Sequence, residues 1–167
     1  MTKTKILALS GILTGMTVLF QVIPVLLTEV FVIFTILSAL PLYIIARLDP
    51  RMGIASYIVA PILIMLLSTH EALFFICTNG PIGLFLGIWQ YYQKSKVFTI
   101  IITGLALTFS LGMINFVVGI PVFGTPLPGV IIAQLGFLFI FSVLYSSFYL
   151  FIANKIYNYL KKLLSFK

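Results

Sequence analysis

The chain has 167 residues, of which 62% are hydrophobic and only 8% are charged, and its formal net charge is +7. A typical soluble domain has about 25% charged residues, so the composition excludes an ordinary soluble globular protein, and the chain is far too apolar to be disordered. A helix that crosses a bilayer needs about 20 apolar residues, so we expect an all-α, polytopic membrane protein that forms a single membrane domain over residues 1–167.

Charges, prolines and glycines divide the chain into six apolar segments. The segment after Lys3 and Lys5 is too long for the hydrophobic region of a signal peptide and is not followed by a small-x-small cleavage site, so we interpret it as the first span. The second and third segments, of roughly 15 to 17 residues, are at or below the minimum span length of about 17 residues, so they are full spans, partly re-entrant segments or spans shielded by neighbouring helices. We expect a six-transmembrane-helix bundle with spans at about 6–27, 30–46, 53–67, 72–92, 97–118 and 130–156.

The basic residues predict how this bundle is oriented. With six spans and a cytoplasmic N-terminus, all ten Lys and Arg residues fall on the cytoplasmic side, and the outer loops keep Glu29, His70 and Glu71 as their ionisable residues. This is the distribution that the positive-inside rule describes. Five spans would place the lysine-rich C-terminal tail outside. We therefore expect both termini in the cytoplasm, and we interpret the net charge as a sign of topology rather than of nucleic-acid binding.

Residue sets for catalysis or metal binding are missing from the sequence. The chain has one Asp, one His and one Cys, which is Cys77. His70-Glu71 matches the start of a zinc motif, but Phe74 stands where the second His is required. A glycine-rich loop with a following Lys-Ser/Thr, which would hold nucleotide phosphate, is also missing. We expect a protein that is not an enzyme and that carries no metal or cofactor.

Amide and carboxyl side chains gather in the outer half of the expected bundle, with Gln21 at this depth in the first span. Polar groups in lipid are costly and therefore tend to face protein or water. The functional interpretation is an outward-facing polar pocket that binds a small molecule, and the acidic excess outside favours a neutral or cationic one. The candidate lining residues are Glu29, His70, Glu71, Asn79, Asn115 and Gln134.

Each of these residues also has a purely structural interpretation. The three ionisable residues are equally explained as solvated loop residues, and Asn115 and Gln134 as partners in hydrogen bonds between helices. In Asn79-Gly80-Pro81 the proline removes a helix hydrogen bond, which either frees carbonyl groups for a ligand or only bends the helix.

Small residues at four-residue spacing predict close helix contacts. Such pairs occur at Gly11 and Gly15 in the first span, at Gly83 and Gly87 in the fourth, and again in the fifth. Some of them must serve internal packing. The first pair, in the cytoplasmic half of its span, is a candidate surface for docking a partner subunit.

Taken together, these features resemble the substrate-binding S components of energy-coupling factor (ECF) transporters. The resemblance covers nearly the whole chain: its length, six spans, both termini inside, the Gly11 and Gly15 pair, and Asn79-Gly80-Pro81-x-Gly83 at the fourth span. It implies a protein of the prokaryotic plasma membrane that captures a vitamin-like micronutrient near the outer face. It further implies partners, namely a membrane coupling subunit that packs on Gly11 and Gly15 and two cytoplasmic ATPases, and a toppling motion that releases the substrate inward.

Two other classes of protein remain open. A structural scaffold of the MreD cell-shape type has similar size and composition and needs no ligand, so an apolar, collapsed outer half would indicate it. A secondary transporter or channel needs a charged or polar path across the midplane, which here is nearly free of ionisable residues, and no internal repeat is visible.

Overall fold

The computed structural model describes residues 3–123 and 129–164, apart from the side chains of Glu29, Leu163 and Leu164. Its elements are all helical within these residues, which confirms the expected all-α class. A 3₁₀ segment, Glu29–Val32, precedes α2, and a π-helical segment, Met113–Val118, follows α7. The α-helices are α1 Lys3–Leu26, α2 Ile33–Leu37, α3 Ala39–Leu48, α4 Pro50–Met65, α5 Thr69–Cys77, α6 Asn79–Tyr91, α7 Lys96–Gly112 and α8 Ile131–Leu164.

Several helical stretches can cross a membrane. In the described part of the chain, five are long and apolar enough to do so, and these are Lys3–Leu26, Val30–Leu48, Thr69–Tyr91, Lys96–Val118 and Ile131–Lys162. The helix at the expected third span, Pro50–Met65, is apolar but has only 16 residues. The protein is therefore a multi-pass membrane protein by its helices, while the third of the six expected spans stays a prediction.

Short polar side chains set the starts of three helices. Asp49 accepts a hydrogen bond from the backbone N–H of Arg51 at 2.9 Å, and Pro50 follows it as the first residue of α4. Ser68 and Ser95 cap α5 and α7 in the same way. Such side chains satisfy N–H groups that have no partner inside the helix, and proline is suited to the first helical turn because its missing N–H is not needed there.

The fourth expected span is broken in the middle rather than bent. α5 ends at Cys77 and α6 begins at Asn79, with Thr78 between them in a non-helical conformation (φ −122°, ψ −82°). Pro81 then falls in the first turn of α6, where the backbone N–H groups have no intrahelical partner in any case. The proline therefore loses no hydrogen bond, and the break places Asn79 at a helix start inside the protein, where it is buried.

Close packing of α3 against α6 forms the centre of the fold. A Cβ atom on Gly83 would lie 2.5 Å from the backbone oxygen of Ala39, and one on Gly87 would lie 2.6 Å from the Cβ of Ala46. Both approaches are too close for any side chain, so these glycines serve internal packing. Gly83 meets Ala39 and Gly87 meets Ala46, so the residue numbers of both helices increase in the same direction along the contact. α3 and α6 are therefore parallel, as expected for two spans that both run toward the cytoplasm.

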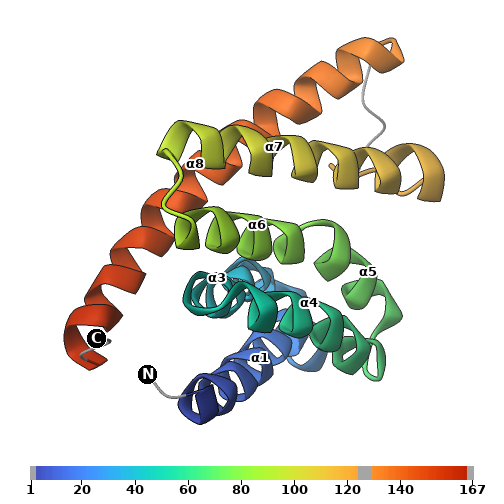
Figure 1. Ribbon diagram of the computed structural model, residues 1–167. Helices are drawn as coiled ribbons and strands as arrows, with labels where there is room; N and C mark the ends of the chain where they lie inside the picture. Colours follow the sequence, from blue (N-terminus) through green and yellow to red (C-terminus); the bar gives the residue numbers. More distant parts are fainter. Residues whose placement is uncertain (1–2, 124–128, 165–167) are drawn as a thin grey trace.

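The start of α1 and the end of α8 lie at the same end of the molecule, together with the connection between α6 and α7 (Figure 1). We call this the terminal end; α5 and the start of α8 lie at the opposite end (Figure 1). Arg47 at the close of α3 ties this helix to α8 at the terminal end. Its guanidinium donates to the side-chain oxygens of Tyr43 and Asn154 and lies 4.0 Å from the ring centre of Tyr157.

Candidate functional site

Gln21 is the centre of a buried polar network at the end opposite the termini. Only 1% of its surface is exposed. Its side-chain nitrogen donates to Oε2 of Glu71 at 2.8 Å, and its oxygen accepts from the hydroxyl of Ser38 at 2.8 Å and from Nδ2 of Asn79 at 3.1 Å. Both lone pairs of that oxygen are thereby used. One side chain thus joins α1 to α5, to α6 and to the junction of α2 and α3.

The sequence of α1 explains why Gln21 points inward. Ser10, Thr14, Thr17 and Gln21 follow one another at spacings of three or four residues and are all buried. Residues at this spacing share one helix face, and in lipid a polar face turns toward protein. On the same face, closer to the start of α1, the Thr14 hydroxyl lies 2.8 Å from that of Ser56 on α4.

A cavity of about 330 Å³ lies beside this network. Asn79 belongs to both: it donates to Gln21 and it lines the cavity. Among the residues that the structure describes, Thr78, Asn79 and Tyr145 are the polar side chains of the lining, and none of these lining residues is charged. The lining is Phe74, Thr78, Asn79, Ile82, Leu107, Leu111, Val122, Phe123, Phe141 and Tyr145. Small-molecule sites are typically apolar hollows of roughly 300–1,000 Å³ with a few polar groups, and this cavity fits that description.

Aromatic rings form one wall of the cavity. The ring of Phe123 meets Phe141 edge-on at 5.1 Å, and Phe141 stacks on Tyr145 at 5.9 Å with an angle of 8° between the ring planes. Parallel and edge-on arrangements of this kind are the favourable ones for aromatic pairs. A planar ring is the ligand shape that such a wall accommodates best.

The predicted site residues are only partly brought together. Asn79 lines the cavity and Glu71 is connected to it through Gln21. His70 is exposed, and its ring lies 4.7 Å from that of Phe74. Asn115, in the π-helical segment, and Gln134, which donates to the backbone oxygen of Gly129 at 3.0 Å, are half-buried and lie outside the lining.

Glu29 begins the 3₁₀ segment, but its side chain lies outside the part of the chain that the structure describes. Its predicted role in the pocket is therefore still a prediction.

Sequence reasoning omitted Gln21 and the aromatic residues from the site. Phe-rich runs are expected to face lipid or core, and the Gln21 partners lie far away in sequence. A signal was nevertheless present in α8, where Phe137, Phe141, Tyr145 and Tyr149 recur every four residues. That spacing places four rings on one helix face.

A larger hollow, of about 660 Å³, lies between α7 and the first part of α8. Its lining is almost entirely apolar, and the hydroxyl of Thr108 is occupied by a hydrogen bond of 2.7 Å to the backbone oxygen of Gly104. Phe109 and Val117 at its edge are strongly exposed. This hollow has the character of a lipid-facing groove and lacks the polar groups that orient a small molecule.

The glycine pair on α1 lies on an open surface. A Cβ atom on Gly11 or on Gly15 would meet nothing within 4 Å. Both glycines line a hollow of about 300 Å³ between α1 and α4, together with Ser10, Thr14 and Ala55. Unlike the pair on α6, they are not needed for packing within this chain.

No protein-family model, no curated protein and no solved structure matches the chain. Within the described residues, no group of three His, Cys, Asp or Glu side chains could hold a metal ion. The function must therefore be inferred from the cavity and its neighbours. These residues offer hydrogen-bonding groups and ring faces, which suit the binding of a small molecule.

Proposed function

We propose that this protein is the substrate-capture subunit of an ATP-driven micronutrient uptake transporter, of the S-component type, in a prokaryotic plasma membrane. The observation that carries the proposal is the cavity beside Gln21, in which Asn79 and Tyr145 offer hydrogen bonds beside an aromatic wall, while the hydroxyl of Thr78 already donates to the backbone oxygen of Phe74 at 2.6 Å. In our topology the cavity is in the outer half of the bilayer, where a nutrient arrives.

The proposed topology has six spans and cytoplasmic termini, with α4 as the third span. At 1.5 Å per residue its 16 residues extend about 24 Å, somewhat less than the hydrocarbon core of about 30 Å. Ile54, Ile58 and Ile62 nevertheless form an exposed apolar stripe along it. Such a stripe is stable in contact with lipid and costly in water. Local thinning of the bilayer accommodates a short span at modest cost.

The ligand that fits this cavity is small, planar and uncharged or cationic. Ring faces favour a flat heterocycle, and the described part of the lining has no basic side chain that would attract an anion. Glu71, held by Gln21, is the nearest carboxylate of the network. Hydrogen bonds to Asn79 and Tyr145 gain strength in so apolar an environment, which favours a ligand with matching polar groups.

The open glycine surface supports a docking role for α1. Small residues allow the backbones of two helices to approach closely. Because Gly11 and Gly15 are open to the outside, a helix of a membrane coupling subunit can pack there, and the two ATPases on the cytoplasmic side would supply the energy. This arrangement also explains why the chain itself needs no nucleotide site.

A structural scaffold of the MreD type is the alternative. It needs neither a cavity nor a polar network in the outer half. What favours capture is that Asn79 is buried and yet lines a hollow instead of being packed on all sides by apolar groups.

Native mass spectrometry of gently purified protein tests the proposal. We expect the wild-type protein to retain a small molecule, or to co-purify with ATPase subunits. Asn79→Leu should lose the small molecule, whereas Asn115→Leu, a matched change outside the cavity lining, should keep it. A wild-type protein that is always empty and solitary, or equal retention by both variants, would contradict the proposal.

A further inference from the structure

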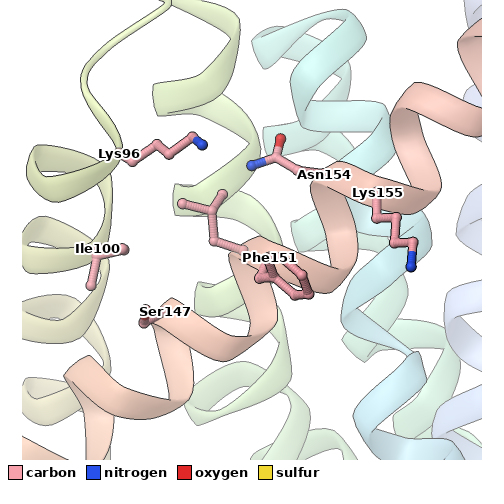
Figure 2. A pocket seen from close by; sticks show the side chains of 7 residues that line it. Lys96, Ile100, Ser147, Phe151, Asn154 and Lys155 are labelled. Carbon is pink, nitrogen blue, oxygen red and sulfur yellow. The ribbon is translucent and has the colours of Figure 1, made fainter.

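A second cavity, of about 520 Å³, lies at the terminal end between the start of α7 and the C-terminal half of α8 (Figure 2). It is separate from the cavity beside Gln21 and shares no lining residue with it. Lys96 and Lys155 belong to its lining, and no acidic residue of the described chain does. The described lining residues are Lys96, Ile100, Ser147, Leu150, Phe151, Asn154 and Lys155.

The neighbours of Asn154 determine which way its amide faces. Its Oδ1 accepts hydrogen bonds from the hydroxyl of Tyr43 at 2.9 Å and from the guanidinium of Arg47. These two donors use both lone pairs of the oxygen. The amide nitrogen, with its two hydrogens, is therefore left for the cavity.

Lys96 and Asn154 turn their side-chain nitrogens toward each other across the cavity, while Lys155 extends away from them (Figure 2). An ammonium group and an amide nitrogen are both donors and offer no acceptor, so they cannot bond to each other. An anion between them would satisfy both. Lys96 is also the first residue of α7, and the positive end of the helix dipole adds to the attraction for negative charge.

Apart from Ser147, the other described lining residues are apolar. Ile100, Leu150 and Phe151 form the wall next to the polar groups, and 70% of the surface of Phe151 is exposed. Lys96 also marks the point where the apolar stretch Lys96–Val118 begins. One cationic and one neutral donor at one side and an open apolar wall at the other match an amphiphile with a negative headgroup better than a freely soluble anion.

We propose that this cavity binds an anionic phospholipid. Its phosphate sits between Lys96 and Asn154, and an acyl chain lies along Ile100 and Phe151. Basic pockets between membrane helices on the cytoplasmic side are suited to such headgroups. The site is independent of the transport function proposed above and needs only that the terminal end lies at the membrane–water interface.

The test is lipid binding by the purified protein in detergent, measured by native mass spectrometry. Phosphatidylglycerol and phosphatidylcholine with identical acyl chains serve as anionic and zwitterionic probes. Lys96→Gln should weaken phosphatidylglycerol binding about fivefold, which corresponds to about 1 kcal/mol per lysine near a membrane surface. The matched control is Lys94→Gln. Lys94 is an exposed lysine in the connection between α6 and α7, two residues before Lys96, and it does not line the cavity.

Asn154→Asp provides a second, nearly isosteric variant. Its carboxylate still accepts from Tyr43 and Arg47, so the fold is preserved, but it presents an oxygen to the cavity where the donor stood. We expect it to weaken phosphatidylglycerol binding on the order of tenfold or more, because a charge-assisted hydrogen bond is replaced by repulsion.

A preference for phosphatidylglycerol that falls in Lys96→Gln and Asn154→Asp and persists in Lys94→Gln would support the proposal. Equal binding of both lipids, or an equal loss in Lys94→Gln, would overturn it. Displacement of phosphatidylglycerol by excess inorganic phosphate would also overturn it, in favour of a site for soluble phosphate.

Discussion

Gln21 of α1 donates its side-chain amide to the carboxylate of Glu71 on α5 at 2.8 Å, and the two residues are fifty positions apart in the sequence. The same Gln21 accepts from Ser38 and Asn79. One carboxamide therefore connects α1 to α5, to α6 and to the junction of α2 and α3. It also holds Asn79, which is one of the residues that line the candidate site.

Gln21→Met should destabilise the protein by about 2 kcal/mol, since three hydrogen bonds are lost and each is worth about 0.6 kcal/mol between membrane helices. Glu71→Gln is the matched control, because its amide oxygen can still accept from Gln21, and it should cost less than about 1 kcal/mol. Thermal unfolding in detergent measures both changes. If the two variants unfold at the same temperature, the network does not stabilise the fold.

Two tyrosines one helical turn apart on α8 should separate ligand binding from stability. Tyr145 lines the cavity, so Tyr145→Phe should weaken ligand binding about fivefold to tenfold, the value of a typical neutral hydrogen bond, without lowering the unfolding temperature. The hydroxyl of Tyr149 instead donates to the backbone oxygen of Ile36 at 3.0 Å.

For that reason Tyr149→Phe should reduce stability by about 1 kcal/mol and leave the affinity unchanged. Ligand titration and thermal unfolding of the same two samples provide the comparison. The reverse pattern would show that the cavity is not where the ligand binds.

The two glycine pairs should respond differently to the same substitution. A Cβ on Gly83 would come within 2.5 Å of the backbone oxygen of Ala39, and the backbone cannot yield easily. Gly83→Ala should therefore cost about 1–3 kcal/mol through overpacking. Gly11→Ala has nothing within 4 Å and should be neutral or slightly stabilising, because alanine has the higher helix propensity.

Unfolding of the isolated subunit distinguishes these two effects. Comparable losses in both variants would mean that the Gly11 face is already covered within the chain. Gly15→Leu, read out by co-purification with a coupling subunit, would then test docking separately, with Gly136→Leu as its control, since Gly136 is also open and lies on α8.

Cysteine labelling should establish the orientation of the bundle. In a Cys77→Ser background, His70→Cys and Lys94→Cys each present one exposed thiol at opposite ends of the span that joins them. With both termini in the cytoplasm, a membrane-impermeant maleimide applied to intact cells should label position 70 and leave position 94 unlabelled until the cells are opened. Labelling of position 94 from outside would refute the proposed topology.

Prediction from sequence succeeded where a residue's own chemistry decides the outcome. The apolar stretches of the first, second, fourth, fifth and sixth expected spans all occur as helices of spanning length in the described chain. Asn79-Gly80-Pro81 marked an irregular point in the fourth span, but the expected bend was wrong, because the helix stops at Thr78 and Pro81 falls in the first turn of α6. Prediction was weaker for the site, since depth in the bilayer does not tell which direction a side chain faces.

Gln134 and Asn115 illustrate this limit. Both have the depth of a pocket residue, yet neither lines the cavity. Phe141 and Tyr145 have the composition of a lipid-facing stretch and form the cavity wall instead. Whether a residue lines the cavity or lies outside it depends on how its helix is rotated about its own axis. That rotation depends on the side chains with which the neighbouring helices pack against it.

By itself, the sequence determined that this is a helical protein of the membrane, because the free energy of moving each side chain from water to lipid adds up along the chain whatever its neighbours are. Only the tertiary structure decided that Gln21 meets Glu71 and Asn79, that Gly83 is enclosed while Gly11 is open, and that Lys96 faces Asn154. Those relations depend on how helices pack, and packing brings together residues that are distant in sequence.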